Sequence, residues 1–379
     1  MNDRTRILAA VGLTVLLFVG VQLGALALTE PFDTSDRQAV ENPDDPANSI
    51  IYFGIILVAT AFMLAAFRYD VQWLIRAMII GVSVMLAWFV LTEFVPPVVT
   101  VGGVNVVAVL AAIGVGAALL FYPEWYVIDT TGVLMGAGAA ALFGISFGLL
   151  PAILLLSVLA IYDAISVYGT EHMLDLAEGV MDLKIPVVFV VPTSLSYSYL
   201  AAGSTDDVLE DGSGEPVQDE TIAATKDEPI AGTEDKTLSP IEDDTIAASS
   251  DEPTTPDDTE DEPAASDDTE GGPTEAEPAE DLDRDALFIG LGDAVIPTVL
   301  VVSAAFFIEA GTIDVPIIAL NLAALGAMVG TIAGLLVLMY MVLKGRPHAG
   351  LPLLNGGAIG GYLIGAVASG LSIVTALGL

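Results

Sequence analysis

The sequence contains no cysteine and only two histidines, His172 and His348. Without cysteine the chain can form no disulfide, thiol nucleophile or Cys-ligated metal site. The two histidines are far apart, and neither belongs to a His-Glu-x-x-His motif, so a zinc metalloprotease site of that type is excluded. We therefore expect no metal and no other cofactor.

Basic residues are also scarce, with 11 Lys and Arg against 49 Asp and Glu and a net charge of -38. This charge repels nucleic acid, so no nucleic-acid partner is expected. Between Asp206 and Asp285 lie 30 of the 49 acidic residues. Because this segment is rich in Asp, Glu, Thr, Ser and Pro and has almost no aromatic residue, it is predicted to be disordered. The acidic balance also suits a cytoplasm of high salt, as in a halophile.

Long apolar runs make up most of the remaining sequence. Hydrophobic residues account for 54% of the chain, and the mean hydropathy is +0.72. Apolar runs of about 18 residues or more predict transmembrane helices. We predict an all-α polytopic membrane protein with nine transmembrane helices, embedded in a lipid bilayer. The approximate limits of the predicted spans are 7–28, 49–67, 71–93, 104–122, 128–145, 149–168, 285–308, 315–343 and 352–377.

The predicted spans divide the chain into three parts. Residues 1–168 carry transmembrane helices 1–6, residues 169–284 form a cytoplasmic loop, and residues 285–379 carry helices 7–9. Within the loop, 171–192 is predicted to hold an amphipathic and then apolar piece, and 202–284 the disordered acidic segment. The apolar end of the first piece is too short to span a membrane. We hypothesise that it covers or lines the mouth of the site.

The distribution of Lys and Arg predicts the orientation. With nine spans and a cytoplasmic N-terminus, only Arg37 lies outside, and eight basic residues close to span ends or in the loop lie on the cytoplasmic side: Arg4, Arg6, Arg68, Arg76, Lys184, Arg284, Lys344 and Arg346. Such a positive-inside bias is typical of membrane proteins. We therefore expect a multi-pass protein of the cell membrane with the N-terminus and acidic loop in the cytoplasm and the C-terminus outside.

Two aspartates, Asp163 and Asp293, lie inside the sixth and seventh predicted spans. An aspartate at mid-helix in lipid costs about 2.5–3.5 kcal/mol, and such residues usually face a bundle interior or a watery cavity. At 1.5 Å per residue, both lie roughly 9–12 Å from the cytoplasmic face. Two consecutive antiparallel helices thus offer two carboxyl groups at one depth. The other acidic residues near spans are expected to be solvated at the membrane surface: Glu93, Glu124, Asp129, Glu309 and Asp314.

A close pair of carboxyl groups can hydrolyse peptide bonds. Because the two groups cannot both ionise easily, they share one proton near neutral pH. One then takes a proton from water while the other hydrogen-bonds the peptide carbonyl. Gly290 and Gly292 let another backbone approach Asp293, and Pro297 removes the N–H that would bond the Asp293 carbonyl, so a kink is expected there.

Three short motifs resemble those of the presenilins, the signal peptide peptidases and their archaeal homologues, which are nine-span GxGD intramembrane aspartyl proteases. The motifs are Tyr162-Asp163, Gly290-Leu291-Gly292-Asp293 and Ala349-Gly350-Leu351-Pro352. The resemblance implies that the two aspartates are catalytic, that Tyr162 packs beside the first, and that the last motif shapes the substrate wall. In that motif Ala349 and Gly350 depart from the family's Pro-Ala, whereas Leu351 and Pro352 match.

The same resemblance implies substrates and partners. The substrates are transmembrane proteins or signal peptides, and accessory subunits are not required in archaeal homologues. A spanning segment must unwind before water reaches its backbone, so substrates are expected to carry Gly, Pro or polar residues near the cytoplasmic half of that segment.

Three alternatives are considered, two that use the same aspartates differently and one that uses other residues. An ion-coupled secondary transporter also has membrane-embedded aspartates and helices interrupted by Gly and Pro, but no repeat relates two halves of this chain. In a non-catalytic scaffold the aspartates would only pair helices. In a rhomboid-like serine protease, Ser146 and His348 would have to meet, yet they fall on opposite membrane faces.

Overall fold

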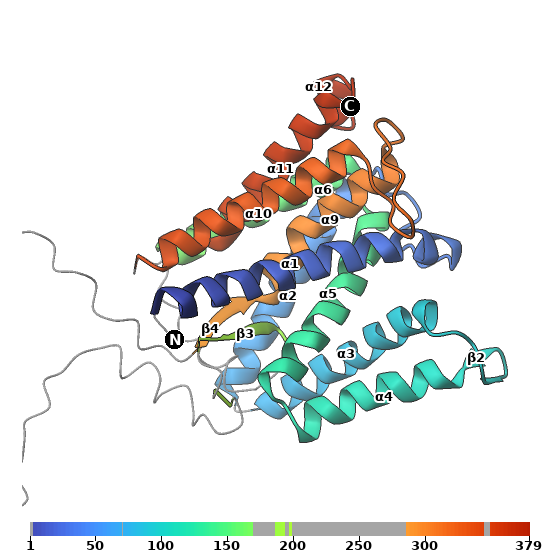
Figure 1. Cartoon of the computed structure of the whole chain (residues 1–379), viewed down its shortest axis with the longest axis vertical. Helices are drawn as coiled ribbons and strands as arrows, with labels where there is room; N and C mark the ends of the chain where they lie inside the picture. The colour runs from blue at the N-terminus through green and yellow to red at the C-terminus, as the bar shows by residue number, and fades with distance from the viewer. Residues whose placement is uncertain (1–2, 70, 170–185, 194–196, 199–285, 345–348) are drawn as a thin grey trace, which may run out of the picture. The chain divides into compact units, whose positions relative to one another are not determined.

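The computed structural model describes residues 3–69, 71–169, 186–193, 197–198, 286–344 and 349–379, which belong to one folded unit (Figure 1). The predicted disordered segment 202–284, the amphipathic part of the preceding loop, and both histidines lie outside these residues.

Nine helices of the described chain correspond one to one to the predicted spans. Seven are long and apolar enough to cross a membrane, and two, α4 and α9, are shorter apolar helices. The helices are α1 (Asp3–Thr34), α2 (Ala47–Arg68), α3 (Gln72–Phe94), α4 (Val106–Phe121), α5 (Trp125–Ser146), α6 (Leu149–Gly169), α9 (Leu291–Phe307), α10 (Leu322–Val342) and α11 (Gly350–Ala368). A four-residue helix, α12 (Ile373–Ala376), follows. The prediction of a helical polytopic membrane protein is confirmed.

Two small antiparallel sheets add to this helical fold. The first, β1 (Thr100–Val101) with β2 (Val104–Asn105), joins α3 to α4. The second pairs β3 (Val188–Pro192) with β4 (Ala286–Gly290), so segments far apart in sequence meet directly before α9. The residues of β3 are mostly β-branched or aromatic, which favours a strand. A short apolar run does not distinguish strand from helix, which is why the sequence pattern merges β4 with α9 into one span.

The predicted start of the eighth span, at residue 315, is wrong, because α10 begins at Leu322. Asn321 caps it: its side chain accepts a hydrogen bond from the Ala324 N–H at 2.8 Å. The same amide donates to the backbone carbonyls of Ala304 and Ile308, each at 2.8 Å. One asparagine therefore fixes the start of α10 to the end of α9.

Glycines let α10 and α11 pack backbone to backbone, and Figure 1 shows the two helices side by side. A Cβ placed on Gly330 would lie 2.0 Å from the carbonyl oxygen of Gly357, and one on Gly361 would lie 2.0 Å from that of Gly326. No side chain fits at these distances. The small-xxx-small spacing in both helices is the sequence signal for this packing.

The helix α5 is the most enclosed of the long spans, and it contacts α1, α3, α9 and β3. Its glycines face large neighbours: a Cβ on Gly144 would lie 2.3 Å from the Cβ of Val302 in α9, and one on Gly138 would lie 2.7 Å from Val90 in α3. The Gly- and Ala-rich composition of this span thus allows neighbouring helices to approach, as expected in lipid.

Candidate active site

The two aspartates approach the same place, the N-terminus of α11. Asp163 on α6 is 9% exposed, and its Oδ2 accepts a hydrogen bond from the Leu351 N–H at 3.1 Å. On the other side, Oδ2 of the partly buried Asp293 lies 3.3 Å from where a Cβ on Gly350 would be. Since Gly350 and Leu351 are consecutive, these two carboxylate oxygens are within about 10 Å of each other. The two side chains also interact electrostatically.

Helix N-termini surround this pair of acids. The first-turn N–H groups of a helix lack intrahelical partners and carry partial positive charge, which stabilises a nearby carboxylate. Asp163 receives such an N–H from α11. Asp293 lies in the first turn of its own helix, α9, whose N-cap is Gly290. These contacts offset part of the cost of placing carboxylates within an apolar bundle.

The position of Asp293 differs from the mid-helix prediction. The residues before Gly290 form β4, so α9 starts only at Leu291, two residues before the aspartate. Asp293 therefore lies where a strand turns into a helix rather than eight residues into a continuous helix. A carboxylate in the first turn is favoured by the helix dipole, whereas one at mid-helix is not. Pro297 lies inside α9, which continues past it to Phe307.

The two glycines before Asp293 are not tightly packed. A Cβ on Gly290 would be 3.6 Å from Asp293 Oδ2, and one on Gly292 would be 3.9 Å from Ile296, both ordinary contacts. Packing within the described chain therefore does not require glycine at either position. Gly292 is exposed, so an incoming peptide backbone has room beside Asp293. Leu291, between them, is buried in a cluster with Phe189 and Ala294.

The last predicted motif lies at the same place as the aspartates, at the start of α11. Ala349 is the buried N-cap residue, with φ of -64°. Gly350 lies beside the Asp293 carboxyl group, and the Leu351 N–H donates to Asp163. Pro352 lies in the first turn, where its missing N–H would have no intrahelical partner in any case.

Tyr162, the residue before Asp163, contacts α2. Its ring packs edge-on against Phe53 of α2, with 5.8 Å between ring centroids. A further residue, Asn355, ties α11 to α6, because its Nδ2 donates to the Leu156 carbonyl at 2.9 Å. The sequence analysis assigned no role to Asn355, although a polar amide within an apolar predicted span was a signal that could have identified it.

The prediction that Glu124 and Asp129 are solvated at the membrane surface is wrong. They are 7% and 3% exposed. Glu124 accepts a hydrogen bond from the Ser198 hydroxyl at 2.6 Å, and Asp129 accepts one from the Val190 N–H at 2.8 Å. The chain after α6 folds back onto the start of α5 and covers both side chains. Span counting does not reveal this return of the chain.

The serine-protease alternative finds no support at Ser146. This residue is fully buried, donates to the Leu142 carbonyl at 2.6 Å and accepts from the Ala39 N–H at 2.8 Å, so it has a structural role at a helix end. Among the described residues no group of His, Cys, Asp and Glu could hold a metal ion.

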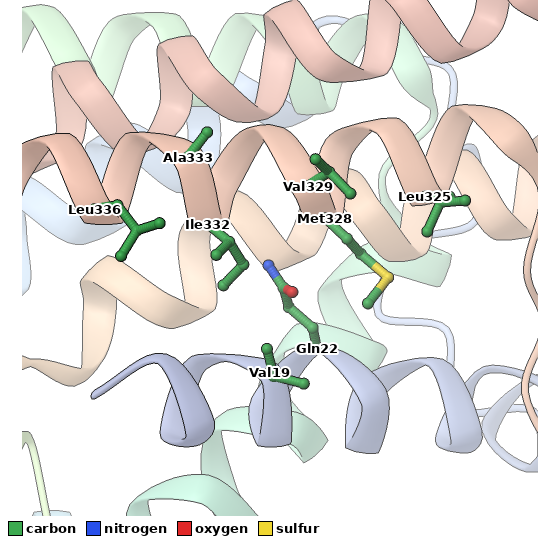
Figure 2. A pocket seen from close by; sticks show the side chains of 8 residues that line it. All are labelled: Val19, Gln22, Leu325, Met328, Val329, Ile332, Ala333 and Leu336. Atoms are coloured by element: carbon green, nitrogen blue, oxygen red, sulfur yellow. The ribbon is translucent and has the colours of Figure 1, made fainter. Parts of the chain in front are cut away.

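A separate groove of about 340 Å³ lies between α1 and α10 (Figure 2). Gln22 projects from α1 toward α10 within it, among apolar side chains. Its lining residues are Val19, Gln22, Leu325, Met328, Val329, Ile332, Ala333 and Leu336. Neither aspartate lines this groove, so it is not part of the candidate active site.

The fold and site define a polytopic helical membrane protein with two acids held at one helix N-terminus. The family profile of signal-peptide peptidase, presenilin aspartyl protease matches residues 15–215 and 260–371, and the chain belongs to this family. It is therefore an intramembrane aspartic endopeptidase, as the sequence motifs predict.

Solved structures agree with this assignment. Two structures of a presenilin family intramembrane aspartate protease are similar to this chain. The one in space group C222 is 27% identical with a TM-score of 0.55, covering 94% of this chain and 99% of that one. The one in P2 is 28% identical with a TM-score of 0.52, covering 93% and 96%. A comparison with curated proteins gave no match. None of these findings favours the ion-coupled transporter.

Proposed function

We propose that Asp163 and Asp293 are the catalytic pair of this protease. The observation that carries the proposal is the shared position at the start of α11: the Leu351 N–H donates to Asp163, and the Asp293 carboxyl group lies 3.3 Å from where a Cβ on Gly350 would be. One rigid helix start thereby locates both carboxyl groups. Tyr162, Gly290, Leu291 and Gly292 support the site from the flanking positions, and Ala349 to Pro352 form its wall.

Hydrolysis needs only these two acids and one water. The ionised carboxylate removes a proton from water as the water oxygen attacks the carbonyl carbon of the peptide bond. The protonated carboxyl group hydrogen-bonds the carbonyl oxygen and stabilises the tetrahedral centre. When that centre collapses, the C–N bond breaks and the departing nitrogen receives a proton from the pair. The acids return to the singly protonated state, so no metal or cofactor is required.

The substrates are transmembrane proteins or signal peptides whose spanning segment unwinds locally. An extended peptide exposes N–H and C=O groups that lipid cannot satisfy. The sheet of β3 and β4 ends at Gly290, three residues before Asp293, so strand-like backbone lies directly beside the acids. The space next to the exposed Gly292 gives such a peptide access to the pair.

The chain is oriented with its N-terminus and acidic loop in the cytoplasm and its C-terminus outside. The positive-inside distribution of Lys and Arg supports this arrangement. Contacts at the two ends of α1 join it to neighbouring segments. Arg6, near the start of α1, donates from Nε to the Thr193 carbonyl just after β3, at 3.1 Å. Near the other end, Arg37 forms an ion pair with Glu93 at 3.3 Å. The chain acts on its substrates without accessory subunits.

The test is reconstitution of the wild type, Asp163→Asn and Asp293→Asn into liposomes with a membrane-spanning reporter that contains a helix-destabilised stretch. We expect cleavage by the wild type alone, blocked by an inhibitor whose hydroxyl group mimics the tetrahedral centre. Cleavage by either variant contradicts the proposal. Proton- or sodium-driven uptake without any cleavage would instead favour the transporter.

A further inference from the structure

A third acid, Asp129, is buried in α5 outside the pair described above. Its Oδ1 accepts a hydrogen bond from the Val190 N–H of β3 at 2.8 Å, while its Oδ2 is buried and has no hydrogen-bond partner in the described part of the chain. Burying a carboxyl group costs several kcal/mol, by rough estimate, unless its contacts compensate. The place of its one hydrogen-bond partner, at the edge of β3, indicates the role of this buried carboxyl group.

Asp129 closes the outer edge of the β3–β4 sheet. In an antiparallel pair, successive N–H groups point alternately toward the partner strand and away from it. The Leu291 N–H donates to the carbonyl of Val187, the residue directly before β3, at 2.7 Å. In β3, the backbone N–H groups of odd-numbered residues therefore point toward β4, and the N–H of Val190 points away from it. Such an edge donor would be costly among apolar helices, and Asp129 satisfies it. Two residues on, Pro192 has no N–H to satisfy.

The face of α5 that carries Asp129 also packs against β3 and the start of α9. Gly132 and Gly136 follow Asp129 at spacings of three and four residues, which places all three on one side of the helix. A Cβ on Gly132 would lie 2.9 Å from the ring of Phe189 in β3. One on Gly136 would lie 3.1 Å from Leu291, the first residue of α9. The polar bond to Val190 thus fixes where the strand lies along this small-residue face.

Few contacts link β3 to Asp293. The register of β3 with β4 holds the five residues before α9, and the 2.7 Å bond from the Leu291 N–H to Val187 holds the first residue of the helix. Asp293 follows two residues later. We propose that Asp129 is a positioning residue that, by anchoring β3 to α5, sets the height of Asp293 opposite Asp163. This inference rests on the proposed catalytic role of the two acids.

The experiment uses the full-length chain in liposomes with Asp129→Leu, Asp129→Asn and Thr130→Val. Leu removes the acceptor for the Val190 N–H, Asn keeps an acceptor oxygen, and Thr130 is exposed on the next position of the same helix. Since a misplacement of about 1 Å can cost about a hundredfold in rate, we expect Asp129→Leu to lower kcat about 10- to 100-fold. We expect KM to stay within about threefold, because the substrate-binding surface is retained.

Three further readouts separate positioning from stability. The concentration of active sites is titrated with the hydroxyl inhibitor, the melting temperature is measured, and the cleaved bonds are mapped by mass spectrometry. We expect Asp129→Leu to shift or broaden the set of cleaved bonds, Asp129→Asn to recover most of kcat, and Thr130→Val to match the wild type. A lower melting temperature with unchanged kcat per titrated site and unchanged cleavage sites would overturn the proposal.

A matched variant keeps the proposal testable if Asp129→Leu does not fold. Gly132→Ala places a methyl group against Phe189 and should displace β3 while leaving the carboxyl group intact. If folded Gly132→Ala gave the kcat and cleavage sites of Thr130→Val, the position of β3 would not affect catalysis and the proposal would be overturned. Cleavage by Asp163→Asn or Asp293→Asn would instead remove the proposed function. Inactive aspartate variants beside a fully active Asp129→Leu would remove the positioning role alone.

Discussion

At the residue scale, the account depends on two acids that lie beside consecutive residues at the start of one helix. Asp163 accepts a hydrogen bond from the Leu351 N–H, and the Asp293 carboxyl group occupies the space next to Gly350. Both interactions come from α11, which explains why a short motif near the last span belongs to the site. Gly350 stands where the family motif has alanine. A Cβ at this position would be 3.3 Å from Asp293 Oδ2 and 3.4 Å from Leu338, so there is little room for a side chain.

Enlarging this glycine should therefore disturb catalysis. Gly350→Val would place methyl groups into the space of the Asp293 carboxyl group, and a displacement of about 1 Å predicts a loss of about a hundredfold in kcat. The control is Gly356→Val in the same helix, since a Cβ on Gly356 meets nothing within 4 Å. Steady-state cleavage of the reporter measures both. Equal kcat values for the two variants would show that the α11 start does not locate Asp293.

At the element scale, the helices were predictable and the strands were not. Apolar runs with positive-inside charges define nine spans because lipid demands a continuous apolar helix surface. The aspartates were found from their own residues, as isolated acids within two predicted spans, whereas the α11 motif was found through its resemblance to the family's motif. The β3–β4 pairing was missed because its two strands lie almost 100 residues apart in sequence and each is a short apolar run. Asp129 was missed for the same reason: its partner is the backbone of β3.

The packing of α10 on α11 yields a prediction for two adjacent glycines. Gly361→Ala would put a methyl group 2.0 Å from the Gly326 carbonyl oxygen, so the helices must separate, at a cost of about 1–3 kcal/mol or more. Gly360→Ala, one residue earlier, meets nothing within 4 Å and should be neutral or stabilise the helix by up to about 1 kcal/mol. Thermal unfolding in detergent compares them. An equal melting temperature would contradict the backbone-to-backbone packing.

At the scale of the whole molecule, the chain combines a membrane bundle with a long acidic insertion between α6 and β4. The family profile leaves residues 216–259 unmatched, and these lie within the acidic segment. The site is assembled from α6, α9 and α11, with β3 and β4 directly before α9. Catalysis should therefore depend on the few residues that form β3 and little on the acidic segment.

Two deletions test this division of labour. Removing residues 204–282 should leave kcat within about threefold of the wild type, since the active-site contacts are retained. Removing 185–192 deletes β3 and its bond to Leu291 and should abolish cleavage. Both proteins are assayed in liposomes after confirming a monodisperse, folded state. Full activity after the second deletion would contradict both the hypothesis that this segment covers or lines the mouth of the site and the role of β3.

The most direct test of the central claim is a double-mutant cycle on Asp163 and Asp293, measured as kcat under single-turnover conditions. Residues that act as one catalytic unit are strongly non-additive, so Asp163→Asn, Asp293→Asn and the double variant should each lose about the same factor, on the order of a thousandfold or more. Losses that multiply in the double variant, or a single variant that cleaves at nearly the wild-type rate, would contradict a shared catalytic pair.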